Sequence, residues 1–83
     1  MIWLIKESKL GPSEVIESSV AYFGPRGWAG LEVTDRVDGF SRFEGGGRHV
    51  LVQPTRQPQS KGSEVRVESL EWDHMTHVFL EML

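Results

Sequence analysis

The chain contains no cysteine, and its longest apolar run is the five residues of Met1–Ile5. The lack of cysteine excludes disulfides, thiolate metal sites and cysteine nucleophiles, and it is typical of a reducing compartment. A membrane-spanning helix needs about 20 apolar residues. A signal peptide carries its positive charge before the apolar segment, whereas in MIWLIKESK the lysines follow that segment. We therefore expect a soluble cytoplasmic protein with no membrane partner.

A surplus of positive charge is missing as well. Nine lysines and arginines stand against 12 aspartates and glutamates, which gives a net charge of −3. Most of the basic residues lie between positions 26 and 66, but acidic residues are interleaved with them there. Binding to nucleic acid depends on neutralising several phosphates at once. We therefore expect no nucleic-acid partner, and nucleic-acid binding stays only as a third alternative.

Motifs for catalysis are also lacking. Several serines are present, but none lies in a nucleophile elbow or beside a recognisable base. The acidic residues are scattered, with no pattern that would set one carboxyl apart as a general acid. We therefore favour a protein without enzyme activity and without a cofactor, and a small enzyme remains the alternative.

The residues that are present predict one small α+β domain spanning residues 1–83. A helix is expected over 12–23, where apolar residues recur at spacings of three and four and Pro12 suits the first helical position. Gly24 would end this helix as a left-handed cap. A second helix is expected over 73–83, with Asp73 as its N-cap.

Five further segments favour strands. Ile2–Ile5 is apolar on both faces, as in a covered strand, and Leu31–Val37 alternates between apolar and polar residues. The others are Phe40–Glu44, His49–Gln53 and Glu64–Trp72.

The connections follow from turn chemistry. Asp38-Gly39 is typical of a type I′ hairpin turn. Residues 53–63 hold two prolines and a glycine without a large apolar residue, which predicts a long mobile loop. A phase change at Leu70 predicts a bulge around Ser69.

The expected order is therefore β-α-β-β-β-β-α, with an antiparallel sheet of four or five strands and two helices on one face. This order resembles the repeat unit of the TATA-box-binding-protein fold and, less closely, half of a helix-grip domain. The segments YFGPRGW, FEGGGRHV and LEWD also resemble a group of small uncharacterised prokaryotic single-domain proteins, a resemblance that implies no activity. A shared fold does not carry function.

Gly45-Gly46-Gly47 is the segment closest to a functional motif. A nest of backbone amides at these glycines, together with Arg48, would hold an anion. However, phosphate loops lead into a helix, whereas the residues after Gly47 favour a strand. We therefore interpret the glycines as a hairpin turn, and Arg48 remains a candidate binding residue.

His74, His77 and Glu81 are spaced so that they share one side of the second helix, and such sets bind zinc in other proteins. A structural zinc site needs a fourth ligand, and the only other histidine is His49, on a separate predicted strand. We therefore expect no metal site, with these three residues as the alternative.

The tryptophans differ in their surroundings. Trp3 and Trp72 lie in or beside strands, which favours packing in the core. Trp28 lies in GPRGWAG, where it either seals one end of the core or, with Arg26, anchors a partner or ligand.

The function that we expect is a non-enzymatic interaction or small-ligand-binding module that forms a homodimer. An edge strand is a ready contact surface for a second chain, and Met1–Ile5 or Glu64–Leu70 would supply it. The loop around Trp28 is expected to join the same contact. A small enzyme or metal-dependent activity using the histidine set is the alternative.

Overall fold

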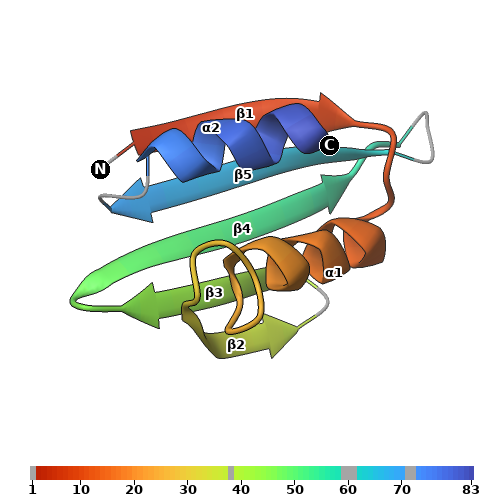
Figure 1. Ribbon diagram of the computed structural model, residues 1–83. Coiled ribbons are helices and arrows are strands. Elements are labelled where there is room, and N and C mark those ends of the chain that lie inside the picture. Colours follow the sequence, from red (N-terminus) through yellow and green to blue (C-terminus); the bar gives the residue numbers. More distant parts are fainter. Residues whose placement is uncertain (1, 38, 59–61, 71–72) are drawn as a thin grey trace.

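The computed structural model describes residues 2–37, 39–58, 62–70 and 73–83. They form a five-stranded antiparallel sheet with two helices on one face (Figure 1). This confirms the expected fold class and order of elements. In chain order the elements are β1 (Ile2–Ser8), α1 (Pro12–Phe23), β2 (Glu32–Val37), β3 (Phe40–Gly45), β4 (Arg48–Arg56), β5 (Ser63–Leu70) and α2 (Asp73–Met82).

The strand order across the sheet is β1-β5-β4-β3-β2. The strands β2 to β5 form a meander, and β1 pairs with β5 from Ile2 opposite Ser69 to Ser8 opposite Ser63. Helix α1 therefore carries the chain from one edge of the sheet to the other. Since β5 lies between β1 and β4, our expectation of Glu64–Leu70 as an edge strand was wrong. The two edges are β1 and β2.

Helix α1 begins as the sequence predicts, with Pro12 in its first turn and Glu14 near its positive end. Its end differs from the expectation. Gly24 has φ −69° and ψ −177°, so it is extended rather than left-handed. A Cβ on Gly24 would lie 2.4 Å from the carbonyl oxygen of Val20. Close approach of backbone, not a left-handed conformation, therefore requires glycine here.

Helix α2 is tied to β1 at its carboxyl end. The Lys6 ammonium donates a hydrogen bond to the Leu80 carbonyl at 2.5 Å, and the Ser8 hydroxyl donates to the Leu83 carbonyl at 3.4 Å. A positive charge is favourable at the negative end of a helix dipole, and α2 has no basic residue of its own in its last turn. The side chain of Asp73, the predicted N-cap, lies outside the described residues.

The core lies between the helices and the sheet and is built around four aromatic rings. The centroid of the Phe23 ring lies 5.6 Å from that of Phe43, 5.0 Å from that of Phe79 and 4.9 Å from that of Tyr22. Such tilted and edge-on pairs add about 0.5–1.5 kcal/mol each beyond burial alone. Aliphatic residues of the sheet and helices complete this core: Val15, Leu31, Val50, Val52, Val65, Val67 and Leu80.

The loop between β4 and β5 is shorter than expected. Strand β4 continues to Arg56 and β5 begins at Ser63, so residues 53–56 belong to the sheet. Pro54 was one of the reasons for expecting a loop. Pairing between β3 and β4 reaches only Ser41 opposite Val52, so beyond that point β4 is paired on one side, by β5. A proline is tolerated where one side of a strand has no partner.

The predicted bulge at Ser69 was also wrong. Burial alternates along β5 through Ser69, and its register with both neighbouring strands is unbroken. Leu70 marks the end of the strand rather than a change of phase within it. The irregularity lies in β2, between Val33 and Asp35.

Two fully buried hydroxyls link α1 to the sheet. Ser19 Oγ donates to the Ile16 carbonyl at 2.6 Å and lies 2.7 Å from Ser41 Oγ. Because Ser19 has one hydroxyl proton and gives it to Ile16, Ser41 must be the donor in the pair. Ser41 therefore needs Ser19 as the acceptor of its proton, whereas the proton of Ser19 is bonded without Ser41.

We predict that Ser19→Ala destabilises the fold more than Ser41→Ala. Loss of Ser19 leaves the buried Ser41 proton without this acceptor, at a cost of about 1–3 kcal/mol. Loss of Ser41 leaves the bond from Ser19 to Ile16 intact and costs about 1 kcal/mol. Urea unfolding of both variants and of the double variant measures this, and the double variant should cost less than the sum. Equal or additive effects would contradict the hydrogen-bond direction.

A second prediction concerns Tyr22, which is the only tyrosine of the chain and is buried. Burial raises the pKa of Tyr22 above its ordinary value because the charged phenolate loses its hydration. Burial of the neutral Tyr22 ring contributes to the free energy of unfolding. Since the pKa of Tyr22 is higher in the folded state, this contribution is fully present below the unfolded pKa of about 10, and it is lost as the pH rises through the folded pKa.

Tyrosinate absorbance should therefore titrate later in the folded protein than in urea. Tyr22→Phe should remove part of the alkaline loss of stability. An unshifted titration curve would show that the ring is hydrated.

Candidate functional site

The glycine segment forms a hairpin turn, as predicted. Gly45 pairs with Arg48 across β3 and β4, which leaves Gly46 and Gly47 as a two-residue turn with φ of +60° and +78°. Positive φ at both positions is what a type I′ turn requires. A shallow hollow of about 350 Å³ beside the turn is lined by Arg48, but also by two glutamates. Those carboxylates oppose binding of an anion there.

The three residues of the alternative metal set lie on the exposed side of α2. His74, His77 and Glu81 are each exposed. Within the described ranges, no three histidine, aspartate or glutamate side chains lie close enough to hold a metal ion. The structure therefore does not bring this set together as a metal site.

Trp28 is the most exposed large hydrophobic residue described, at 84%. Its loop packs tightly against the end of α1. At Gly27 the backbone comes so close to the helix that a Cβ there would lie 2.2 Å from the carbonyl oxygen of Tyr22. Leu31, further along, is buried and donates a backbone hydrogen bond to Phe23. Of our two interpretations of Trp28, sealing the core is therefore wrong, and display at the surface is what the structure shows.

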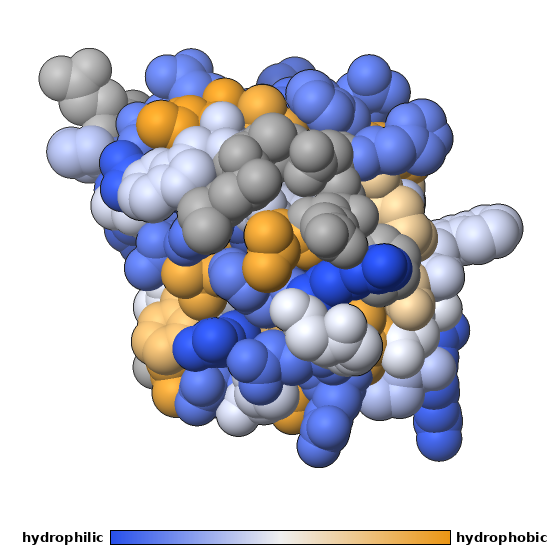
Figure 2. All heavy atoms as spheres, turned by 90° about the vertical axis from the view of Figure 1, so that its left-hand side faces the viewer, coloured by the Kyte–Doolittle hydropathy of each residue, from blue (hydrophilic) through white to orange (hydrophobic). Residues whose placement is uncertain are grey.

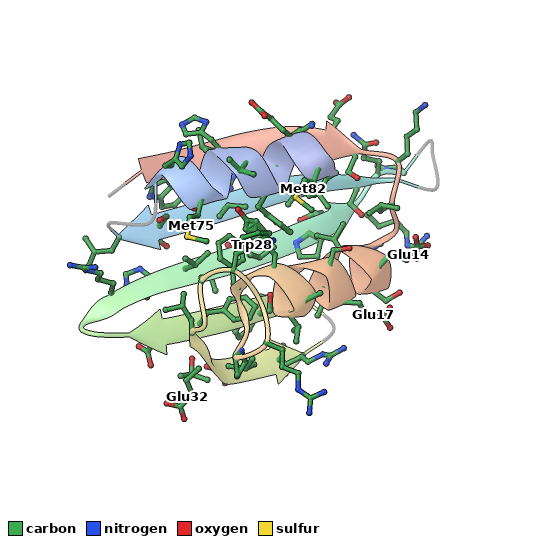
Figure 3. All side chains as sticks on the ribbon, viewed as in Figure 1. Glu14, Glu17, Trp28, Glu32, Met75 and Met82 are labelled. Atoms are coloured by element: carbon green, nitrogen blue, oxygen red, sulfur yellow. The ribbon has the colours of Figure 1, made fainter. Side chains whose placement is uncertain are left out.

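Figure 3 places Trp28 on the helix side of the molecule, between the two helices in that view. Met75 and Met82 of α2 lie around it in the same view, and Met82 is 67% exposed. Arg26, the other predicted binding residue of this loop, is exposed. Trp72 lies outside the described residues, as does Asp38 of the predicted β2–β3 turn.

No helix of the described residues lies on the other side of the sheet (Figure 1), and we call that side the open face. Register and burial define its members. They are Trp3, Ile5 and Glu7 of β1, Glu64, Arg66, Glu68 and Leu70 of β5, His49, Leu51, Gln53 and Thr55 of β4, Phe40, Arg42 and Glu44 of β3, and Glu32, Asp35 and Val37 of β2.

Exposed apolar side chains gather on the open face. Trp3 is 58% exposed, Ile5 57% and Val37 51%. The prediction that Trp3 packs in the core, in a strand covered on both faces, was therefore wrong. Alternation along β1 directs Leu4 and Lys6 to the helices and Trp3 to the open face. There the Arg66 guanidinium carbon lies 5.3 Å from the centre of the Trp3 ring, a distance typical of a cation–π contact.

The open face also carries more negative than positive charge. Its members include six carboxylates but only two guanidinium groups. Arg42 forms a salt bridge of 3.1 Å with Glu44, and both side chains are nearly half exposed. Such an exposed pair is worth less than about 1 kcal/mol. Exposed apolar residues therefore lie among these charged members, which the sequence alone did not predict.

The end of the molecule that holds the start of β1 and the β3–β4 turn shows the same mixture. Figure 2 shows small hydrophobic areas there, separated by hydrophilic side chains.

Comparisons with protein families, with curated proteins and with solved structures find no match to this chain. The likeness to the TATA-box-binding-protein repeat unit therefore rests on the order of elements alone. Among the described residues, no helix combines the length and the apolar character needed to cross a membrane.

We predict that duplex DNA does not bind the open face, because its surplus of carboxylates repels phosphates. Fluorescence anisotropy with a labelled random duplex at low salt should show no binding up to high micromolar protein. Sub-micromolar binding that weakens steeply with added salt would contradict this prediction.

Proposed function

We propose that the chain is a non-enzymatic interaction domain that acts as a homodimer, formed by pairing of two β1 edge strands. The observation that carries this proposal is the exposure of Trp3 and Ile5 on an edge strand. We also propose that the fold is that of the TATA-box-binding-protein repeat unit, and this likeness carries no function.

The two edges of the sheet differ in how well they are protected against pairing. Strand β2 has a register shift between Val33 and Asp35, and its exposed residues include Glu32 and Arg36. Bulges and charges are the usual protection of an edge strand. Strand β1 has seven residues in unbroken register with β5. Of its two charged residues, Lys6 is hydrogen-bonded to α2, and Glu7 lies near the carboxyl end of the strand. It is therefore the edge that a second chain can extend.

Antiparallel pairing of two β1 strands about Leu4 brings the exposed apolar residues together. In that register Trp3 of each protomer lies opposite Ile5 of its partner, and Lys6 lies opposite Ile2. No like charges are then opposed, and aromatic–aliphatic pairs across strands contribute about 0.2–1 kcal/mol each. A twofold arrangement uses the same strand on both protomers and closes on itself.

Trp28 does not belong to this contact. Helix α1, which precedes its loop, packs on β3 and β4, whereas α2 packs on β5. In Figure 3, α2 stands between Trp28 and the β1 edge. We therefore separate the two surfaces that we had expected to act together.

We propose further that the domain has no enzyme activity. The buried serines Ser19 and Ser41 are hydrogen-bonded to each other and to backbone rather than to an imidazole. The exposed histidines of α2 are not grouped with two further ligands among the described residues. Both observations support an interaction domain over the small enzyme that we held as the alternative.

The dimer is tested by Ile5→Lys, with Val37→Lys as the matched control on the opposite edge. Both side chains are more than half exposed, so each change should lower the free energy of unfolding by no more than about 1 kcal/mol. Ile5→Lys should have the larger effect, because Ile5 lies directly opposite Arg66 across β1 and β5. Ile5→Lys places two positive charges near the twofold axis and should give a monomer in analytical sedimentation. Val37→Lys should leave the dimer intact.

Wild-type protein should pass from dimer to monomer on dilution. A wild-type monomer at high micromolar concentration would reject the proposal. Dissociation by Val37→Lys but not by Ile5→Lys would place the contact on the other edge.

A further inference from the structure

We propose that the open face binds a basic amphipathic helix of a protein partner. This interaction uses the face of the sheet, whereas homodimer formation uses the β1 edge. Trp3 and Ile5 take part in both, and the rest of the face is open to a monomer and to a dimer alike.

The open face is a sheet surface on which no second layer of the described residues packs. A sheet buries an apolar face against a second layer, most often of helices. On the other face, α1 and α2 already do this (Figure 1). On the open face, Trp3, Ile5 and Val37 are each more than half exposed, while Phe40 and Leu51 are half-buried between them. These side chains supply apolar contacts for one further helix.

The charge of the face identifies the kind of helix. Four more carboxylates than guanidinium groups lie on it. Both guanidinium groups already have a partner: Arg42 pairs with Glu44, and Arg66 lies over the Trp3 ring. Lysine or arginine side chains flanking an apolar stripe would complement the remaining carboxylates.

Two pairs of carboxylates make this complementarity specific to the face. Glu7 lies directly opposite Glu64 across β1 and β5, and Glu32 lies directly opposite Glu44 across β2 and β3. Like charges in directly opposed positions destabilise a sheet. Arg42 already offsets the charge of Glu44, so the repulsion that a basic partner would reduce, and an acidic one increase, lies mainly between Glu7 and Glu64.

The same charges argue against the other occupants of such a face. A second copy stacked face to face would oppose two surfaces of like charge. Nucleic acid and anionic lipid would meet the carboxylates with phosphates. A basic polypeptide is therefore the occupant to which the observations lead.

The test uses two labelled peptides of equal length with identical leucine positions along one helical face. One peptide carries lysine at all other positions, and the second carries glutamate. Fluorescence anisotropy with the full chain should show binding of the lysine peptide that weakens as salt is added. The glutamate peptide should show no binding.

Variants then place the binding on the open face. Glu64→Gln with Glu68→Gln should weaken binding of the lysine peptide about three- to tenfold, from the loss of two charge contacts at the surface. The matched control is Glu14→Gln with Glu17→Gln, which removes the same charge from exposed residues of α1 on the helix side (Figure 3). This control should leave the affinity unchanged within twofold.

Thermal unfolding supplies a second readout of opposite sign. Glu64→Gln removes the repulsion by Glu7 and should raise the melting temperature of the free protein while it weakens peptide binding. Loss of affinity through general unfolding would lower both.

Equal weakening by both double variants would mean attraction to the net charge alone and would overturn the proposal. Equal binding of both peptides, or no binding of either, would overturn it as well. Sedimentation of the same variants without peptide keeps this outcome distinct from that of the dimer, since neither double variant changes β1.

Discussion

Pairing of β1 with β5 is the constraint on which the rest of the structure depends. It joins the first strand of the chain to the last along all seven residues of β1. Because the meander β2 to β5 fills the remaining positions, α1 must cross the sheet from one edge to the other. The same pairing brings Lys6 and Ser8 under the end of α2 and holds that helix in place. It also leaves β1 as an edge and Trp3 outside the core.

Local sequence signals predicted the elements well because each has a local cause. The spacing of apolar residues and Pro12 predicted α1, and the glycines predicted the turn between β3 and β4. The misplaced features depend on neighbours that no local pattern reveals. Pro54 continues a strand because β3 stops short of it, and Gly24 is required by contact with Val20 rather than by its own φ.

The candidate surfaces were harder to predict than the elements. A run such as Ile2–Ile5 looks the same whether its strand is central or at an edge, so its burial depends on topology and not on composition. Trp3 shows the consequence, since half of β1 faces a side of the sheet with no cover. The glutamate pairs were equally hidden, because Glu7 and Glu64 become neighbours only through the register of β1 and β5. The small neighbours of Trp28 are a local signal that singled it out, but they left core packing and display at the surface open, and the choice between them needed the structure.

The close packing of Gly27 against α1 has a consequence for how this chain tolerates change. Any side chain at Gly27 would collide with the carbonyl oxygens of Ala21 and Tyr22, so that position has no freedom to vary. Its neighbour Trp28 is almost entirely in solvent and can be replaced at little cost to folding. Adjacent positions of one loop thus differ sharply in what they tolerate: only glycine fits at 27, whereas the side chain at 28 is open to redesign without loss of the fold.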